Sequence, residues 1–314
     1  MLPIPVLAHP AELHESGPTR TIPFDIHQNI GVKYPASSPN LLASFLRICK
    51  SESLETEARA TSQAFYVIKG KGQTSSVHGT VKWATGDMLV LPKCATPITH
   101  EADPAGDCSI YWVHDEPLMR YLGVTPSEAI FSPTVIRREQ MLQEVERISH
   151  EPGAEHRNRM GILLGNKVTD YVDEGGSGTL TLTPTLWSLL NVLPPHDVQR
   201  PHRHNSVALD LCVYAAKEGG VYTLMGPELD DQGMVRNPIR CDWLSGSMFL
   251  TPPGWWHSHH NESGEPAWVL PMQDAGLYTY QRTLDIRFST APTTAPSKAE
   301  DEVTPAVDSL KTVA

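Results

Sequence analysis

The sequence predicts an all-β protein made of two copies of one barrel unit, with a short helical connection between them. Short apolar runs rich in Val, Ile, Tyr, Phe and Trp recur along the chain, and many of the 27 prolines and 22 glycines fall between them. Such runs, bounded by turn residues, are typical of β-strands. Both halves also contain Gly-Xaa5-Pro after a strand, at Gly86–Pro92 and Gly246–Pro252. A duplicated β-barrel is the simplest account of this repetition.

Taken in order, the chain divides into five segments. Residues 1–40 are mixed and Pro-rich and predict an N-terminal arm, and strand-like runs fill 41–124. Residues 125–155 predict a helical connection, because PTVIRREQMLQEVERI has apolar residues at helical spacing between charges. Strands resume over 156–288, and the few bulky apolar residues of 289–314 predict a disordered tail. The main strand-like runs are LLASFLRIC, QAFYVIKGKGQTSSV, VKWATGDMLVLP, DCSIYWVHD, RMGILLGN, TLTLTPTLWSLLNVLP, SVALDLCVYAA, GGVYTLMG, GSMFLTPP and AWVLPM.

Charge and composition narrow the class of protein. The formal charge of −11 and the lack of a basic run argue against nucleic-acid or membrane partners. No stretch approaches the roughly 20 apolar residues of a membrane-spanning helix, and MLPIPVLAHP lacks the basic start of a signal peptide. Five scattered cysteines without a CxxC pair indicate a reducing compartment, so a cytoplasmic protein is expected.

Three histidines predict a metal site in the second half. His202 and His204 stand at i and i+2, which on a β-strand point to the same face. His257 follows a turn built from Pro252, Pro253 and Gly254 in the stretch GSMFLTPPGWWHSHHN. Imidazoles converging from two strands suit Fe, Zn, Cu or Ni, and chance clustering is the weaker explanation.

The surrounding sequence resembles the cupins. The second cupin signature, Gly-Xaa5-Pro-Xaa-Gly-Xaa2-His-Xaa3-Asn, is met at Gly246, Pro252, Gly254, His257 and Asn261. The first signature is met at its two histidines, but His196 replaces its glycine, and Ala208 and Leu209 stand where its acidic ligand would fall. Cupins with three histidines and no carboxylate include the gentisate and salicylate 1,2-dioxygenases, and HRHNSVAL and WHSHHN are similar to their local sequences.

This resemblance implies two tandem cupin barrels of the double-stranded β-helix, or jelly-roll, type, with the metal-bearing one in the C-terminal half. It implies a non-haem Fe(II) extradiol-type dioxygenase that uses O2 to cleave an aromatic ring. The first barrel is expected to be metal-free, with Glu57, Arg59, Gln63 and Pro97 at the ligand positions and His100 an ordinary surface histidine.

The resemblance also implies roles for residues around the metal. His259 is a candidate acid-base residue, with a structural histidine as the alternative. Arg159, Trp187, Asn191 and Asp210 are candidate substrate contacts. A surface ion pair is the alternative for Arg159, and core packing is the alternative for Trp187.

Asp210 stands where the family has a carboxylate-binding Arg, so the local charge is inverted. The expected substrate is therefore a substituted phenol of aminophenol, salicylate or hydroquinone type, rather than gentisate. The segment 227–240 is a candidate lid, whose Arg236 and Arg240 would supply the missing positive charge. His196 and His260 are interpreted as surface residues.

Two other classes of function stay open. The chain could be another cupin enzyme, either a diketone-cleaving dioxygenase or a metal-dependent isomerase. It could also be a small-molecule-binding bicupin with a structural metal, although structural sites usually have four ligands and only three are found. The imidazoles accept Mn, Ni or Zn as well as Fe, and the family tends to form dimers or tetramers, so a homo-oligomer is expected.

Overall fold

The computed structural model describes residues 3–94, 97–154, 160–166 and 179–290, which form two compact units. The first unit contains Ala11–Arg138 and Leu164–Trp187. The second contains Val6–Pro10, Glu139–Leu163 and the chain from Ser188 onward. Most of the predicted tail, from residue 291, lies outside the described residues.

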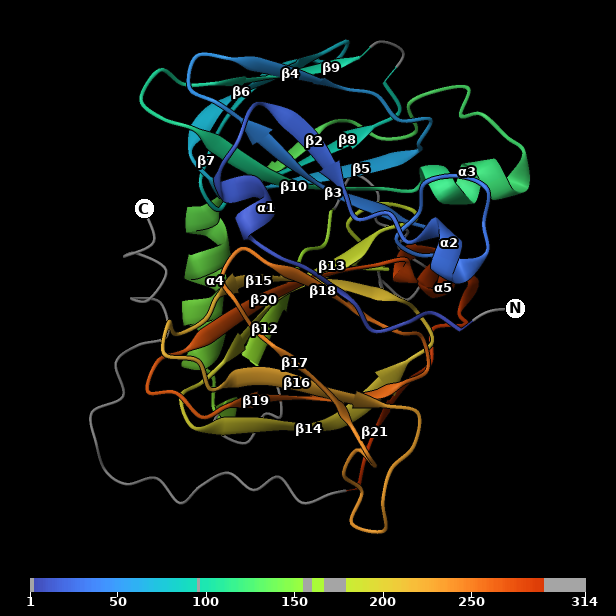
Figure 1. Cartoon of the computed structure of the whole chain (residues 1–314), viewed down its shortest axis with the longest axis vertical. Helices are drawn as coiled ribbons and strands as arrows, with labels where there is room; N and C mark the ends of the chain where they lie inside the picture. The colour runs from blue at the N-terminus through green and yellow to red at the C-terminus, as the bar shows by residue number, and fades with distance from the viewer. Residues whose placement is uncertain (1–2, 95–96, 155–159, 167–178, 291–314) are drawn as a thin grey trace. The chain divides into compact units, whose positions relative to one another are not determined.

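In the first unit a six-stranded sheet, ordered β11-β8-β5-β10-β3-β2, faces a four-stranded sheet, ordered β4-β9-β6-β7 (Figure 1). The facing sides of the two sheets share one apolar cluster that includes Phe65, Trp83 and Trp112. The strands are β2 Arg20–Pro23, β3 Leu42–Ile48, β4 Ser53–Thr56, β5 Ser62–Lys69, β6 Lys71–Ser76, β7 Gly79–Ala84, β8 Met88–Pro92, β9 Ile98–Ala102, β10 Cys108–His114 and β11 Thr134–Ile136.

The second unit repeats this architecture with a six-stranded sheet, β1-β18-β15-β20-β13-β12, and a five-stranded sheet, β17-β16-β19-β14-β21 (Figure 1). Cys212, Val221 and Phe249 belong to the apolar cluster between these sheets. The strands are β1 Ala8–His9, β12 Met160–Leu163, β13 Trp187–Leu193, β14 Asp197–His204, β15 Ala208–Tyr214, β16 Val221–Gly226, β17 Ile239–Asp242, β18 Met248–Thr251, β19 Trp256–Asn261, β20 Ala267–Gln273 and β21 Ile286–Phe288.

The two units are copies of one strand order. The series β8-β5-β10-β3 corresponds to β18-β15-β20-β13, and β7-β6-β9-β4 corresponds to β17-β16-β19-β14. The predicted all-β class with two tandem jelly-roll barrels is therefore confirmed.

The helices are short and lie outside the barrels' sheets. They are α1 Glu12–Glu15, α2 His27–Ile30, α3 Glu116–Leu122, α4 Arg138–Ser149 and α5 Ala275–Gln281. Helix α4 falls within the predicted helical connection and buries Met141, Val145 and Ile148 at helical spacing. In the described part of the chain, no helix combines the length and apolar character needed to cross a membrane.

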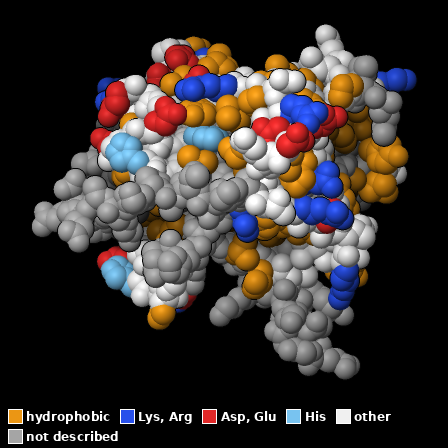
Figure 2. Space-filling view, turned by 90° about the horizontal axis from the view of Figure 1, so that it is seen from below, with side chains coloured by type: hydrophobic (Ala, Val, Ile, Leu, Met, Phe, Trp, Pro, Cys, Tyr) orange, Lys and Arg blue, Asp and Glu red, His pale blue; other side chains and the backbone are white. Residues whose placement is uncertain are grey.

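The N-terminal arm is built into the sheets. Its first strand, β1, pairs with β18, and β2 pairs with β3. The buried Arg47 guanidinium donates to the carbonyl oxygens of His14, Glu15 and Gly17, which fixes the arm beside β3. On the face shown in Figure 2, basic and acidic side chains are interspersed over the described residues, so the net negative charge is not concentrated there.

Candidate metal centre

Three buried imidazoles converge inside the second barrel. The ligand atoms of His202, His204 and His257 all lie within 4.8 Å of one another, and this is the one group of that kind in the described residues. The residues are 1%, 4% and 3% exposed. His202 and His204 share a face of β14, and His202 is paired across the sheet with His257 of β19.

A β-bulge produces this pairing. The register between β14 and β19 runs from Asp197 to Gln199 and shifts before His202, so Arg200 and Pro201 interrupt the ladder. A bulge inserts an extra residue and re-aims the side chains that follow it. As a result Gln199 and His202 both face the barrel interior although they are three residues apart.

A tight turn delivers His257 to the site. Gly254 has φ +76°, a left-handed conformation that glycine adopts without steric cost, and its N–H donates to the His204 carbonyl oxygen at 2.7 Å. The Asn261 side chain donates to the carbonyl oxygens of Leu193, Pro194 and Glu265. The signature Gly and Asn therefore hold the two ends of the ligand-bearing strand.

Backbone carbonyls orient two of the rings. His204 Nδ1 lies 2.9 Å from the Ser206 carbonyl oxygen, and His257 Nδ1 lies 3.1 Å from that of Trp255. A carbonyl oxygen only accepts, so each Nδ1 carries the proton and Nε2 is left as the metal-binding atom. This arrangement is typical of metal-ligating histidines.

His259 is held beside the three rings by a polar chain. Its ring centroid lies 6.0 Å from that of His202 and 5.8 Å from that of His257. Its Nδ1 lies 2.8 Å from the Thr223 hydroxyl, which accepts a hydrogen bond from the Trp243 indole N–H at 2.8 Å. The hydroxyl is thereby poised to donate its own proton to Nδ1, which places the His259 proton on Nε2.

The predicted substrate contacts fall into different surroundings. The buried Asn191 exchanges two hydrogen bonds with Gln199, at 3.1 and 3.3 Å. Asp210 is 4% exposed, shares the inward face of β15 with the core residue Cys212, and accepts a 2.6 Å hydrogen bond from Thr251. Trp187, half-buried, begins β13 on the same face as Asn191. Arg159 lies outside the described residues.

Gln199, Thr223, Trp243 and Thr251 join this interior and were not predicted. The sequence predicts that Gln199 and His202 point to opposite faces, because residues three apart on a regular strand do so. Only the bulge returns Gln199 to the interior. Thr223 and Thr251 come from strands, and Trp243 directly follows one, and the sequence does not show how these strands pair.

The first barrel has no ligands at the corresponding positions. Trp83 Nε1 donates to Thr74, whose hydroxyl lies 2.8 Å from His100 Nδ1, so His100 corresponds to His259. The position of His257, two residues earlier, is Ile98, and Ile98 pairs with Thr56 as His257 pairs with His202. Ala58 then corresponds to His204.

This register corrects two sequence predictions. Glu57, Arg59 and Pro97 are exposed, so the predicted ligand positions are wrong by one residue, and a shift of one residue reverses a strand's faces. Gln63 does face the interior, where it accepts a hydrogen bond from Trp112. His100 is fully buried rather than a surface residue, and burial lowers its pKa to about 3.

Two further predictions change. His196 is exposed as expected, but His260 is 8% exposed, and burial lowers its pKa to about 4. The hypothesis that Arg240 brings positive charge to the pocket is wrong. Cys241 shares the inward face with its partner Thr223, so Arg240 faces outward, where its guanidinium lies 3.7 Å from the Tyr222 ring centre. A guanidinium nitrogen of Arg236 lies 3.7 Å from a carboxylate oxygen of Glu228, so this charge has a partner within the same segment.

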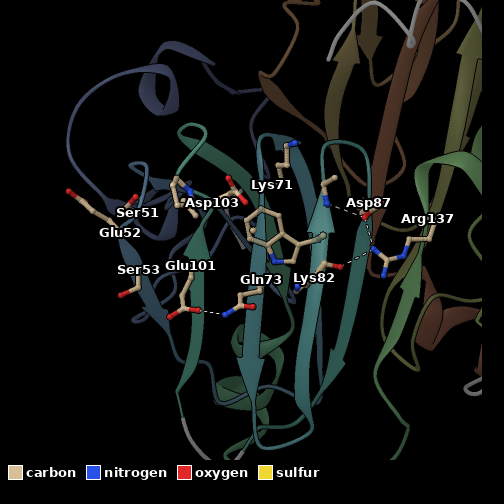
Figure 3. Close-up of a pocket in the computed structure, with 15 residues that line it drawn as sticks. Ser51, Glu52, Ser53, Lys71, Gln73, Lys82, Asp87, Glu101, Asp103 and Arg137 are labelled. Atoms are coloured by element: carbon tan, nitrogen blue, oxygen red, sulfur yellow. Dashed lines mark hydrogen bonds and ion pairs between the residues drawn. The ribbon is translucent and has the colours of Figure 1, made fainter.

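A hollow of about 790 Å³ in the first unit is a separate feature (Figure 3). It lies over the outward side chains of the smaller sheet, among them Gln73, Lys82 and Glu101. Some of its polar groups satisfy one another: the Gln73 amide donates to Glu101, and Arg137 forms an ion pair with Asp87 (Figure 3). Nothing in this mixed, solvated lining selects a ligand.

The fold consists of two tandem jelly-roll barrels, and the candidate metal centre lies in the C-terminal barrel. The chain is similar in structure to the salicylate 1,2-dioxygenase of Pseudaminobacter salicylatoxidans, with a TM-score of 0.66 and 15% identity over 91% of this chain and 88% of that chain. A variant of that enzyme in complex with gentisate gives a TM-score of 0.66 and 14% identity over 91% and 86%. These likenesses confirm the predicted bicupin resemblance at the level of the fold.

Two other comparisons bear on the chain. The oxalate decarboxylase of Lactobacillus farciminis, in its formate complex, gives a TM-score of 0.51 and 12% identity over 85% of this chain and 86% of that chain. In sequence, 77 residues are 39% identical to the 5-aminosalicylate 1,2-dioxygenase of a Comamonas species. That match spans 24% of this chain and 20% of the relative. No family model matches the chain.

Proposed function

We propose that the chain is an Fe(II)-dependent dioxygenase that opens the ring of a substituted phenol with O2. The observation that carries the proposal is the three-histidine group without a carboxylate, inside a barrel whose fold is shared with salicylate 1,2-dioxygenase. The local sequence match to a 5-aminosalicylate 1,2-dioxygenase adds support from an independent comparison.

The residues fit a divalent metal that keeps open positions. His204 and His257 present Nε2 atoms whose rings are fixed from behind by carbonyl oxygens. Three protein ligands leave positions for other molecules, whereas a structural metal site is usually closed by four. Bound Fe(II) would supply the redox chemistry that couples an electron-rich ring to O2. Three neutral ligands leave the full charge of the metal to attract a phenolate.

The chain's own residues would bind the substrate and move its proton. Thr223 holds the His259 ring in place, and His259 would present its Nε2–H to an oxygen of the substrate. Asp210 would accept a hydrogen bond from a substrate amine or hydroxyl and, unlike an arginine, would not hold a substrate carboxylate, which favours an aminophenol over gentisate. Asn191, fixed by Gln199, and Trp187 would form part of the pocket wall.

Oxygen consumption by Fe(II)-loaded protein tests the proposal. The panel is gentisate, salicylate, 5-aminosalicylate, 2-aminophenol and hydroquinone, with His204→Ala as the control. We expect uptake with amine-bearing phenols that requires both Fe(II) and His204, and mass spectrometry of the product identifies the ring bond that is cleaved. Asp210→Asn should shift preference away from the amines.

Silence across the panel, from protein that binds one metal ion per chain, would contradict the dioxygenase assignment and favour an isomerase or a binding protein. Equal activity with Mn(II) or Zn(II) would contradict the assignment of iron. The structure of the product tests the extradiol-type cleavage, and a product opened at any other ring bond would contradict it.

A further inference from the structure

The C-terminal strand β21 lies along the two ligands of β14. It pairs antiparallel with that strand at only three positions, Phe288 with His202, Arg287 with Arg203 and Ile286 with His204. Ile286 is 44% exposed and Phe288 is 43% exposed. A three-residue strand at a sheet edge has little burial to hold it in place, so its coincidence with the ligand positions needs a reason.

Hydrogen bonds fix the chain on both sides of the ligand pair. Before the pair, the Ser289 N–H donates to the Pro201 carbonyl oxygen at 2.8 Å. After the pair, the Asn205 side chain accepts from the Asp285 N–H at 2.9 Å and donates to the Thr283 carbonyl oxygen at 2.9 Å. Every residue from 201 to 205 is therefore tied to the segment 283–289.

These bonds support β14 at a place where its pairing with β19 is interrupted. The bulge breaks the register with β19 at Arg200 and Pro201, directly before His202. On that side, the part of β14 beyond the bulge keeps the pairing of His202 with His257 and the hydrogen bond from Gly254 to the His204 carbonyl oxygen. Strand β21 supplies a second neighbour on the other edge.

One side chain of the strand also contacts a ligand ring. The Phe288 ring is stacked with that of His202, with centroids 5.8 Å apart and planes at 29°. The Arg200 guanidinium lies 5.0 Å from the Phe288 ring centre. Phe288 thus links the bulge to the first metal ligand, an arrangement consistent with the offset stacking that aromatic rings prefer.

The first barrel provides an internal comparison. Its counterpart of β14 is β4, which pairs with β9 and forms the outer edge of its sheet among the described residues. That barrel has Thr56, Ala58 and Ile98 in place of the three histidines. The added strand therefore accompanies the barrel that has ligands to hold.

We propose that β21 is a clasp that positions His202 for metal binding, with Phe288 as the positioning residue. The inference rests on the three-histidine metal centre of the proposed function, but not on the reaction it carries out. The clasp holds the ligand strand in its metal-binding form before the ion arrives, so its loss lowers affinity without removing a ligand.

Titration of the metal-free protein with Co(II), followed by its visible absorption, tests the clasp. Loss of a group that orients a ligand typically lowers metal affinity 10–100-fold, and we expect about tenfold for Phe288→Ala. Phe288→Tyr keeps the ring and should restore affinity. Arg287→Ala is the matched control, because its side chain lies on the opposite face of the same strand and pairs with Asp285. The melting temperature of the metal-free protein should be similar in all three.

Deleting the clasp gives a second measurement. A chain ending at Leu284 should lose more Co(II) affinity than Phe288→Ala, whereas one ending at Thr290 should match the parent. Co(II) should also slow amide hydrogen exchange in 285–289. Parent-like affinity in both Phe288→Ala and the chain ending at Leu284 would overturn the clasp. A parent chain that binds no Co(II) would instead overturn the metal centre itself.

Discussion

At the scale of single residues, the main chain decides how the ligands face. His204 and His257 each direct Nδ1 to a carbonyl oxygen two residues away in sequence, so their tautomers are set locally. His259 depends instead on Thr223 and Trp243, which come from other parts of the barrel. The His204 and His257 rings are therefore fixed by short-range contacts, and the neighbouring acid-base candidate is fixed by long-range ones.

We expect His257→Ala to abolish metal binding, because two imidazoles from one strand cannot close the site. Metal content per chain after dialysis against Co(II), measured by mass spectrometry, should fall from one to near zero. His100→Gln is the control, since His100 is also buried but lies in the barrel without ligands. Loss of metal in the control, or its retention in His257→Ala, would contradict this assignment.

Replacement of Thr223 by Val should separate stability from activity. It removes the partner of both His259 and the buried Trp243 N–H, and an unsatisfied buried group costs about 1–3 kcal/mol. Thr74→Val makes the same change around His100 and Trp83. Urea unfolding should show similar losses for both variants, but only Thr223→Val should lower kcat. A parent-like kcat in Thr223→Val would argue that His259 is structural.

At the scale of elements, the site depends on three local features: a bulge, a turn and a short additional strand. The bulge in β14 turns His202 inward, the left-handed Gly254 brings β19 back against His204, and β21 covers the open edge of β14. Regular strands alone would have placed Gln199 and His202 on opposite faces. The irregular positions are therefore the ones that assemble the site.

Gly254→Ala tests the turn. A Cβ at this position meets no atom within 4 Å, so the cost comes from φ +76°, which is about 1–2 kcal/mol for a residue with a side chain. We expect a loss of that size in urea unfolding, together with weaker Co(II) binding. Gly264→Ala, also in open space but without a positive φ, should be close to neutral. Equal effects of the two substitutions would contradict the role given to the turn.

At the scale of the whole molecule, one strand plan serves two purposes. Both barrels keep a Trp–Thr–His chain inside the smaller sheet, at Trp83–Thr74–His100 and Trp243–Thr223–His259. In the first barrel the second nitrogen of His100 contacts Thr56, which stands at the position of His202. The first barrel thus ends this network at a hydroxyl, and the second has the imidazole of His202, a proposed metal ligand, at the same position.

Buried neutral histidines predict acid sensitivity. Burial lowers the pKa of both His100 and His114 to about 3, against about 6.5 in an unfolded chain. Between these values the unfolded state binds more protons, so the free energy of unfolding should fall as the pH is lowered from 6.5 towards 4. Burial raises the pKa of Asp115, which acts in the opposite direction.

Urea unfolding of the metal-free protein at pH 7, 6 and 5 measures this slope. His100→Gln should flatten it, because its proton-binding difference is removed while those of His114 and His260 remain. An unchanged slope in that variant would show that His100 is not a source of the acid sensitivity.

The homo-oligomer expected from the sequence is a separate prediction. Light scattering of the protein without urea measures it.

Much of the fold and the centre of the site could be predicted from the sequence. The turn-bounded apolar runs gave the all-β class, and the repeated Gly-Xaa5-Pro gave the duplication. The spacing of His202, His204 and His257 gave the three imidazoles, because residues two apart on a strand share a face whatever the strand packs against. These features depend on local sequence and can therefore be predicted without a structure.

Only the tertiary structure decided what surrounds them. The bulge that brings Gln199 inward, the outward turn of Arg240 and the burial of His100 all depend on which strand pairs with which, and in what register. The same holds for β21, whose three residues have no strong pattern of their own. Strand register is set by contacts between residues far apart in the chain, and a shift of one residue exchanges the inner and outer faces of a strand.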